Sequence, residues 1–576
     1  MEGESSHRHR ANALRVSKVF VKFATLGLSP YTQSSELSPP QQPPITLPAD
    51  RFRSLSLPSK AMSSSPSLEI LVRDAEGFIV WNGPPFSSNG QPTPKNERVS
   101  CSSTKFSLDG SKFMAVKSDG TISIYDSASL REMRSFAVAN VTAAEISPCG
   151  TYLQTFQKPT TPQEKNVSLW NTDTGDLAHG LYQKSITKTT WPSIRFSPDE
   201  SSACRLATNE VQFFDPKDFS KGITSRIRVP GVAAFELSKT PASHVAVFVP
   251  EVKGSPGSVQ IFGCGKDAES QPSARRSFFR CSSVQFSWNH GSTGLLVVVQ
   301  SDVDKTNKSY YGETKLHYLT VDGTHEGLVP LRKEGPVHDV QWSFSGSEFA
   351  VVYGFMPACV TIFDKKCKPL MELGEGPYNT LRWNPKGRIL CVAGFGNLPG
   401  DMTFWDVVSK KQLGSNKAEW SVTSEWSPDG RYFLTASTAP RRQIDNGIKI
   451  FNYDGKLLKN IITTCLTKRV EWKPESPDRF DEISELLRSV ESLKLEEGKS
   501  QGQGSSQKKL VASIPTIQRP AAYRPPHAKQ AAAIQAEVLL LVMNFSMMSK
   551  NALRNKKKRE KKKAAEAAAA SGSNNA

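Results

Sequence analysis

The sequence has no pair of cysteines at C-x-x-C spacing. Its nine cysteines are scattered from Cys101 to Cys465 along 576 residues. That distribution fits neither a disulfide framework nor a zinc site, and it agrees with a reducing compartment, the cytoplasm. The longest charge-free apolar run, Val538 to Phe545, has eight residues, whereas a helix that crosses a bilayer needs roughly 20. We therefore expect no metal site, no disulfide framework and no membrane partner.

Signatures of common catalytic and nucleotide-binding sites are missing as well. The chain contains no GxxxxGK[ST] loop, no HExxH helix and no GxSxG elbow, and its nine histidines are dispersed without partners at metal-ligand spacing. The glycine-rich stretch 394–400 (GFGNLPG) lies between two strand patterns. No helix N-terminus follows it to receive a phosphate. We expect that the protein is not an enzyme and has no cofactor.

A repeated pattern fills the middle of the chain. An aromatic or aliphatic anchor precedes a turn rich in Ser, Pro, Asp and Gly, as in EWSPDG at Trp426, and a β-prone run follows. In such a turn Ser and Asp bond their own backbone, Pro fixes φ and Gly accepts a positive φ, so the turn joins two antiparallel strands. The anchors are 40 to 56 residues apart, a spacing typical of propeller blades. They are Phe106, Ile146, Phe196, Leu237, Phe286, Trp342, Trp383, Trp426 and Trp472.

A second pattern follows each of the first eight anchors: a short alternating strand that usually ends in an aromatic residue and Asp or Asn. Alternation of apolar and polar residues indicates a half-buried strand. The ninth anchor, Trp472, has no such strand after it, whereas EGFIVWN (76–82) has no anchor before it. A ring closes when N-terminal strands complete the last blade, which hides both sheet edges. The sequence therefore predicts an all-β fold, a nine-bladed β-propeller over residues 68–474, in which residues 76–82 pair with strands after Val470.

Residues 1–67 are predicted to be a disordered extension. Residues 29–66 contain eight prolines and ten serines, a composition that cannot bury enough apolar surface to fold. The preceding stretch is basic and apolar enough to imitate a transit peptide, although Glu2 and Glu4 argue against targeting. We expect instead that translation starts at Met62, and that residues 1–61 are dispensable for folding.

Two segments are expected directly after the propeller. Residues 475–498 are predicted to form an amphipathic helix, and residues 499–548 a flexible linker. The apolar face of the helix could bind a partner or dock on the propeller wall, and the sequence does not decide between these. The residues on this face are Phe480, Ile483, Leu487, Val490 and Leu493.

The last segment, residues 549–576, is predicted to be a basic, partly helical tail. Residues 473–576 carry 19 basic and 11 acidic side chains, whereas residues 62–472 are nearly balanced at 46 and 40. A lysine run of this kind contacts phosphates without reading sequence, in a salt-sensitive way. A solubility tail and a nuclear signal are the alternatives. The residues predicted to contact RNA or the ribosome are Lys550, Arg554, Lys556, Lys557, Lys558, Arg559, Lys561, Lys562 and Lys563.

Several longer strings resemble the eukaryotic translation initiation factor 2A family, over roughly residues 68–563. They are NGPPF at Asn82, SDVDKTNKSYYGETKLHYL from Ser301, VVYGFMPACVTIFD ending at Asp364, AGFGNLPGDMTFWDV ending at Val407, STAPRRQIDNGIKIFNYDG ending at Gly455, and the basic tail. The resemblance implies a nine-bladed propeller with an extended C-terminal region. It also implies a non-enzymatic initiation factor that binds the small ribosomal subunit and promotes codon-dependent, GTP-independent binding of initiator methionyl-tRNA on a limited set of mRNAs. Other initiation factors are expected partners of the C-terminal region.

Two departures from the family and two alternatives accompany this resemblance. Residues 1–61 have no recognisable counterpart, and AEVLLLVMNFSMMSKNAL stands where a polar linker is expected. The propeller component of the larger initiation factor three complex has similar AGFG and RRQIDN-like strings, but that family carries an N-terminal RNA-recognition domain. Here only 67 residues precede the first strand pattern, without its aromatic signature. A generic propeller scaffold is the third possibility, and ribosome co-sedimentation separates it from the other two.

Overall fold

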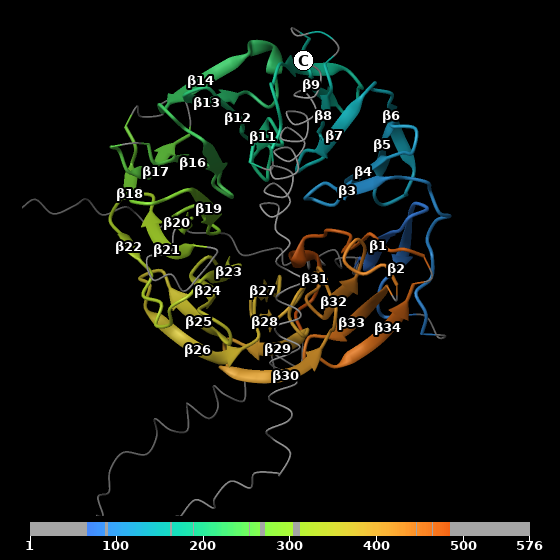
Figure 1. Ribbon diagram of the computed structural model, residues 1–576. Coiled ribbons are helices and arrows are strands. Elements are labelled where there is room, and N and C mark those ends of the chain that lie inside the picture. The colour runs from blue at the N-terminus through green and yellow to red at the C-terminus, as the bar shows by residue number, and fades with distance from the viewer. Residues whose placement is uncertain are drawn as a thin grey trace, which may run out of the picture.

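The computed structural model describes residues 66–483, except 87–89, 160, 162–163, 188, 253, 265–270, 303–311, 445 and 464. The described residues form nine antiparallel sheets around a central axis (Figure 1), eight with four strands and one with three. The prediction of an all-β, nine-bladed propeller is confirmed. Within the described ranges the helical segments are the two 3-10 turns η1 (Phe219–Lys221) and η2 (Pro477–Arg479).

Each blade runs from an inner strand at the axis to an outer strand at the rim. The inner strands are β3 (Ser103–Phe106), β7 (Val141–Ile146), β11 (Arg195–Phe196), β15 (Ala234–Leu237), β19 (Ser283–Trp288), β23 (Val337–Trp342), β27 (Thr380–Trp383), β31 (Thr423–Trp426) and β35 (Arg469–Trp472). The second strands are β4 (Lys112–Val116), β8 (Tyr152–Gln157), β12 (Ala203–Ala207), β16 (His244–Val249), β20 (Gly294–Ser301), β24 (Glu348–Tyr353), β28 (Ile389–Ala393), β32 (Tyr432–Ser437) and, in the closing blade, β1 (Glu69–Arg73).

The third strands contain the aromatic residues of the second sequence pattern. They are β5 (Ile122–Asp126), β9 (Val167–Asn171), β13 (Glu210–Phe214), β17 (Gly257–Gly263), β21 (Glu313–Thr320), β25 (Ala358–Asp364), β29 (Asp401–Asp406), β33 (Gly447–Asn452) and, in the closing blade, β2 (Phe78–Asn82). The outer strands are β6 (Glu132–Phe136), β10 (Leu177–Leu181), β14 (Ile223–Arg228), β18 (Ala274–Phe278), β22 (Glu326–Leu328), β26 (Pro369–Gly376), β30 (Lys411–Lys417) and β34 (Leu457–Ile462).

The anchors stand at the ends of the inner strands, where they pack between blades. In the fifth blade this position belongs to Trp288 and not to Phe286: Trp288 ends β19 and is buried, while Phe286 is only partly buried. Four anchors donate their indole N–H to a backbone carbonyl of the preceding inner strand. The pairs are Trp288 to Glu236 (3.4 Å), Trp342 to Ser287 (2.8 Å), Trp383 to Gln341 (3.2 Å) and Trp426 to Arg382 (2.9 Å).

The Ser-Pro-Asp-Gly turns form as their chemistry predicts. After β31, the Ser427 hydroxyl donates to Asp429 Oδ1 at 2.5 Å, and the same oxygen of Asp429 accepts the N–H of Arg431 at 3.0 Å. Gly430 has a φ of 71°, which an L-residue with a side chain rarely adopts. These turns lie at one face of the ring, here named the turn face. The loops between second and third strands, and those between blades, lie at the other, the loop face, because the antiparallel register places them at the opposite strand ends.

The ring closes in the blade that contains both ends of the described chain. β35 pairs with β1, with Ile70 opposite Trp472 and Val72 opposite Val470, and β1 in turn pairs with β2. In Figure 1, β1 and β2 accordingly lie beside β31–β34. The direct partner of β35 is thus β1, not residues 76–82 as the sequence analysis expected. Strand β1 was missed because it is buried on both faces and lacks the apolar–polar alternation of the others.

A loop completes this three-stranded blade on its outer side. Residues 93–99 run along β2: Phe78 and Val99 exchange backbone hydrogen bonds of 2.9 and 3.0 Å, and the N–H of Lys95 donates to Val80 O at 2.8 Å. Between these contacts the side chain of Asn96 accepts the Val80 N–H at 2.8 Å, in place of a backbone carbonyl. The outer edge of β2 is therefore covered although the loop forms no regular strand.

The segment after the ring is not the helix that the sequence predicts over 475–498, at least as far as residue 483. After η2 the backbone continues without helix, and Phe480 and Ile483 are buried in two different hydrophobic clusters of the ring. Lys386 donates from Nζ to Phe480 O at 2.7 Å, which fixes this segment on the turn face. An extended chain can reach both clusters, whereas one turn of helix brings residues three apart onto the same side. Leu487, Val490 and Leu493 lie outside the described residues.

Deleting residues 68–82 should abolish cooperative unfolding of the propeller. The deletion removes β1 and β2, exposes the edge of β35 and opens the core that contains Ile70 and Val72. Calorimetry or circular dichroism against temperature measures this, with a chain lacking only residues 1–65 as the control. A sharp transition at the parental temperature in the 68–82 deletion would contradict the closure of the ring by β1.

Candidate functional site

The inner strands are linked around the axis in both directions. Anchors reach back to the preceding blade, and the residues just before the anchors reach forward to the next one. Lys105 forms an ion pair with Glu145 of the second blade, and Arg382 donates from Nε to Ser424 O of the eighth blade at 3.1 Å. The closing blade is joined to the first by Arg73, which donates to Ser102 O at 2.8 Å. The charged side chains near the axis therefore hold blades together.

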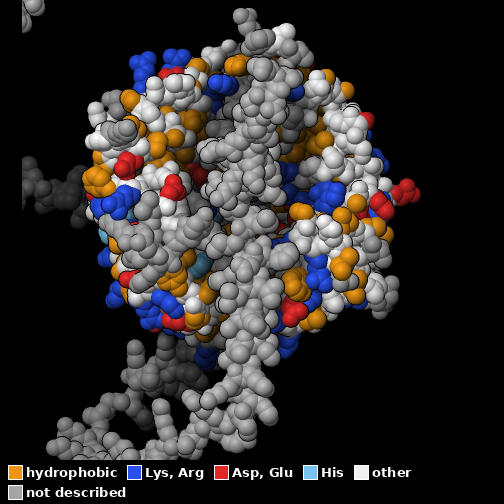
Figure 2. All heavy atoms as spheres, viewed as in Figure 1, with side chains coloured by type: hydrophobic (Ala, Val, Ile, Leu, Met, Phe, Trp, Pro, Cys, Tyr) orange, Lys and Arg blue, Asp and Glu red, His pale blue; other side chains and the backbone are white. Residues whose placement is uncertain are grey.

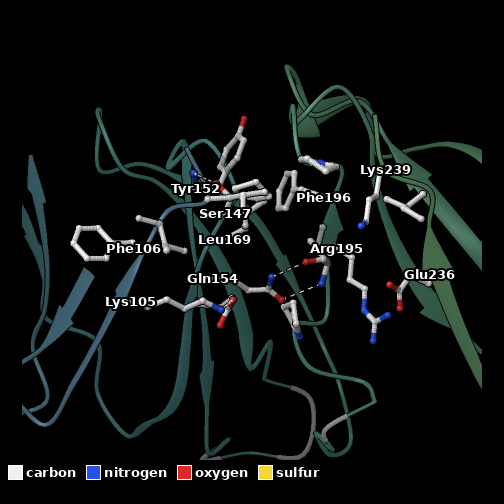
Figure 3. A pocket seen from close by; sticks show the side chains of 18 of the residues that line it. Lys105, Phe106, Ser147, Tyr152, Gln154, Leu169, Arg195, Phe196, Glu236 and Lys239 are labelled. Atoms are coloured by element: carbon white, nitrogen blue, oxygen red, sulfur yellow. Dashed lines mark hydrogen bonds and ion pairs between the residues drawn. The ribbon is translucent and has the colours of Figure 1, made fainter. Parts of the chain in front are cut away.

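A hollow of about 480 Å³ opens between the inner strands of the first four blades (Figure 3). Its charged lining alternates in sign, with Lys105 beside Glu145 and Arg195 near Glu236. Arg195 donates to Phe235 O at 2.6 Å and to Thr189 O at 2.5 Å, and its guanidinium lies 4.7 Å from the centroid of the Phe235 ring. The side chain of Gln154, which also lines the hollow, donates to Ile194 O and accepts the N–H groups of Ser193 and Ile194.

Burial shifts two charged groups in this hollow toward their neutral forms. The Glu236 residue is accessible to solvent, but partial burial of its carboxyl between the surrounding strands raises the pKa of that carboxyl. The positive charges of Arg195 and Lys239 partly offset this rise. Burial likewise lowers the pKa of the Lys239 ammonium. Lys105 pairs with Glu145, and Arg195 donates to two backbone carbonyls beside Glu236, so most of the positive charge in the hollow is matched by its own wall. We expect it to be a structural seam between blades.

A second hollow, of about 630 Å³, lies across the axis and involves the seventh to ninth blades. Glu425 and Glu471 stand on neighbouring inner strands there, with Arg382 and Arg469 nearby. Burial raises the pKa of Glu425 to about 7, the negative charge of Glu471 adds to this, and the Trp472 N–H that Glu425 accepts at 3.1 Å opposes it. Glu471 itself is paired with Arg469 at 2.7 Å. This arrangement also links blades rather than presenting charge outward.

The loop face presents a different kind of surface at the seventh and eighth blades. Trp420, in the loop 418–422 between β30 and β31, is 55% exposed. The Arg442 guanidinium, from the loop between β32 and β33, lies 5.2 Å from the centroid of the Trp420 ring. Arg441 donates to Gly396 O at 3.1 Å and to the side-chain oxygen of Asn397, both in the loop between β28 and β29. Three loops of two blades thus meet around one exposed indole.

The basic run predicted to contact RNA lies outside the described residues, as do the other residues of the segment after Ile483. This applies to Lys550, Arg554, Lys556, Lys557, Lys558, Arg559, Lys561, Lys562 and Lys563. Of the predicted partner-binding face, Phe480 and Ile483 are buried on the ring and are therefore not available to a partner. From the sequence, Arg441 and Arg442 lie near a blade turn and could either contact rRNA or be ordinary loop charges, and the second interpretation is favoured there. No sequence pattern singles out Trp420. The one sequence signal for Trp420 is that this tryptophan lies outside both the anchor pattern and the strand pattern.

Charged side chains are mixed over the ring surface. Figure 2 shows lysine, arginine, aspartate and glutamate interspersed over the uncovered part of the visible face, without a broad area of one sign. Among the described residues there is no group of three His, Cys, Asp or Glu side chains that could hold a metal ion. Nor does that part of the chain contain a helix long and apolar enough to cross a membrane.

Comparison with known proteins places the ring among translation factors. The profile of the family described as "Eukaryotic translation initiation factor eIF2A" matches residues 276–468. Proteins named "Eukaryotic translation initiation factor 2A" are 38% identical over 377 residues in Schizosaccharomyces pombe (64% of each chain) and 31% identical over 495 residues in Caenorhabditis elegans (81% of this chain and 82% of that one). This chain thus spans less than two thirds of the S. pombe relative.

Two further similarities complete the comparison. A solved structure, "Crystal structure of the eukaryotic initiation factor", superposes with a TM-score of 0.63 at 32% identity, over 72% of this chain and all of that one. A Xenopus laevis protein that is named as one component of eukaryotic translation initiation factor 3 is more distant. It is 24% identical over 418 residues, which are 69% of this chain and 58% of that protein.

Replacing Glu425 by Gln should stabilise the ring at pH 8 by about 1–3 kcal/mol. A carboxyl whose pKa rises from about 4.3 in the unfolded chain to about 7 in the ring binds more protons when folded. Its contribution to stability therefore falls as pH rises from about 4 to 7. Gln can still accept the Trp472 N–H but does not titrate. Urea unfolding at pH 5 and pH 8 tests this, with the exposed Glu419→Gln as control; equal pH dependence in parent and Glu425→Gln would refute the raised pKa.

Proposed function

The chain belongs to the eukaryotic translation initiation factor 2A family, and from that premise we propose how this initiation factor acts. It binds the small ribosomal subunit and promotes codon-dependent, GTP-independent binding of initiator methionyl-tRNA on a limited set of mRNAs. It works in the cytoplasm as a binding protein and not as an enzyme. The observation that carries the proposal is the combination of a closed ring of family type with a strongly basic C-terminal run.

The ring supports a role as a scaffold that keeps its shape. Its inner strands are joined by hydrogen bonds and ion pairs between successive blades, and the closing blade joins the two ends of the ring. Such a body can hold two partners at a fixed separation. The charged side chains near its axis pair with groups of neighbouring blades. We therefore expect RNA to bind the loops and the C-terminal segment.

The glycine-rich stretch 394–400 supports independence from GTP. It connects β28 to β29, and two of its amides donate to protein carbonyls: Gly400 to Gly394 O within the loop at 2.8 Å, and Gly396 to Ser421 O of the loop between β30 and β31 at 3.0 Å. A phosphate-binding loop needs several convergent amides directed at the ligand. In this loop, these two donors already serve protein carbonyls.

The basic run in residues 549–563 is proposed as the main contact with ribosomal RNA and tRNA. It carries nine basic residues and a single acid, Glu560, and lysines of such a run recognise phosphate charge and not base edges. Phe480 and Ile483 fix the start of the C-terminal segment on the turn face. The remaining apolar residues of the predicted helix, Leu487, Val490 and Leu493, are proposed to bind other initiation factors.

The second candidate function is that of a propeller scaffold like the initiation factor 3 component of the comparison. It has less support, because the identity to that protein is 24% whereas it reaches 38% in the 2A family. Association with the small ribosomal subunit in the presence and absence of the other components of initiation factor 3 separates the two. Dependence on those components would favour the second candidate.

Replacing seven residues of the basic run by Gln should flatten the salt dependence of small-subunit and tRNA binding. Each phosphate contact contributes roughly −0.7 to −0.9 to the slope of log K against log salt, so the loss is several units and at most about six. Thermal stability of the ring should not change. The residues are Lys556, Lys557, Lys558, Arg559, Lys561, Lys562 and Lys563.

A charge-matched control keeps the change in net charge but moves it to exposed lysines in turns of the ring and at the start of β30. Its seven substitutions to Gln are at Lys217, Lys365, Lys366, Lys368, Lys410, Lys411 and Lys456. Filter binding at four salt concentrations compares the two variants with the parent. The basic run is not the main phosphate contact if both variants lower the salt slope equally, or if neither variant lowers it.

A further inference from the structure

Trp420 is an exception among the ten tryptophans. All ten lie within the described residues, and Trp420 alone is classed as exposed, whereas the others are buried or partly buried. Its backbone φ is +62°, a left-handed conformation that is unfavourable for a bulky side chain. An indole open to water in a strained backbone contributes little to folding, so this residue and its conformation need another explanation.

The surrounding loops hold the indole in a defined place. The Ser421 carbonyl accepts the Gly396 N–H at 3.0 Å, the Val422 N–H donates to Ala436 O at 2.9 Å, and Ser437 Oγ donates to Glu419 O at 3.3 Å. These bonds tie the loop that carries Trp420 to both neighbouring blades. The indole is therefore preorganised, which lowers the entropic cost of binding.

The Arg442 side chain is fixed beside the ring in turn. Its Nε donates to Ile444 O at 2.9 Å while its guanidinium lies against the indole, and Asn446 donates to Arg442 O at 2.9 Å. Val422 and Ile444 are exposed next to this pair in sequence, 40% and 73% respectively. The surface thus combines an aromatic ring, a guanidinium and apolar edges.

Local charge separates this surface from the rest of the ring. The segments 417–422, 438–446 and 463–468 carry four Lys and Arg against two Asp and Glu, whereas residues 62–472 carry 46 against 40. Hydrogen bonds join the second and third segments: the Ala439 N–H donates to Thr467 O at 2.8 Å, and the Thr467 N–H donates to Asn446 Oδ1 at 2.9 Å. The first segment meets the second where the Arg442 guanidinium lies against the Trp420 ring. A cationic excess around an exposed aromatic ring is the arrangement that binds single-stranded nucleic acid, because bases stack on the ring and phosphates meet the cations.

We propose that Trp420, Arg441 and Arg442 form a stacking site for single-stranded RNA on the loop face. An unpaired base stacks on the Trp420 indole, and the two guanidiniums face the adjoining phosphates. The site deepens the proposed function, on which it rests, by adding to the charge-reading basic run a contact that requires unpaired bases. It lies on the face opposite the turn face, where Phe480 and Ile483 hold the C-terminal segment.

Binding of a labelled ten-nucleotide oligouridylate to the full chain tests the site. Trp420→Gly should weaken binding about tenfold, as expected for the loss of one stacked base. Glycine accepts the positive φ, so the melting temperature should equal or exceed that of the parent. Trp420→Phe, which keeps a ring for stacking, should stay within about threefold of the parent, and RNA should quench the red-edge indole emission of the parent but not of Trp420→Phe.

A double substitution with a charge-matched control tests the two arginines of the site. Arg441→Gln with Arg442→Gln should weaken oligouridylate binding by about tenfold, whereas Lys365→Gln with Lys366→Gln, an equal charge change on an exposed turn of the sixth blade, should leave it within about twofold. A ten-base-pair RNA duplex should bind parent and Trp420→Gly equally, because its bases are not free to stack.

The outcomes separate this site from the basic run. Replacing the run by Gln should lower the salt slope for single strand and duplex alike, whereas Trp420→Gly should leave the slope unchanged and affect the single strand only. The proposal is overturned if Trp420→Gly binds oligouridylate as tightly as the parent does. It is also overturned if Trp420→Gly melts several degrees below the parent, because Trp420 would then have a structural role. Loss of a protein partner with unchanged RNA affinity would also overturn it and identify a protein-binding surface.

Discussion

The pairing of β1 with β35 is the constraint on which the rest of the ring depends. Every other blade is built from strands that are consecutive in the chain, but this one joins segments about 400 residues apart. Ile70, Leu71 and Val72 are almost completely buried in the joint, so the two ends of the ring share one core. Without it, β1 and β35 would both be open sheet edges. Closure also fixes Phe480 and the start of the C-terminal segment, since Phe480 packs into the same cluster as Ile70.

Closure determines what the charged residues near the axis can do. In a closed ring each inner strand has two neighbours, and the side chains of Lys105, Arg382 and Glu425 are used to join them. Among the described residues near the axis, these groups are matched with partners of the wall. We therefore propose that RNA is recognised at the periphery, by the loops and the C-terminal segment. Trp420 shows the consequence most clearly, because its indole is exposed to water whereas the other tryptophans are buried or partly buried.

The blade count follows from the sequence because one turn chemistry and one anchor recur nine times. Finer features depend on tertiary contacts. Phe286 and Trp288 are two residues apart and point to the same side of β19, so spacing cannot tell which one packs between blades. Phe480 and Ile483 have helical spacing, but an extended chain uses them to reach two clusters. The stacking surface had no pattern to reveal it, since it is assembled from three loops that converge only in the folded ring.

We propose that this initiation factor reaches the small ribosomal subunit through RNA, with the basic run supplying charge and the ring supplying position. Sucrose-gradient co-sedimentation of purified small subunits with the full chain and with residues 66–483, at two salt concentrations, tests it most directly. Ending the shorter chain at Ile483 keeps the residues that dock on the ring. We expect the full chain to sediment with the small subunits at low salt and to dissociate at high salt, while the ring alone binds more weakly and with less salt dependence. Absence of the full chain from the small-subunit fractions at low salt would contradict it.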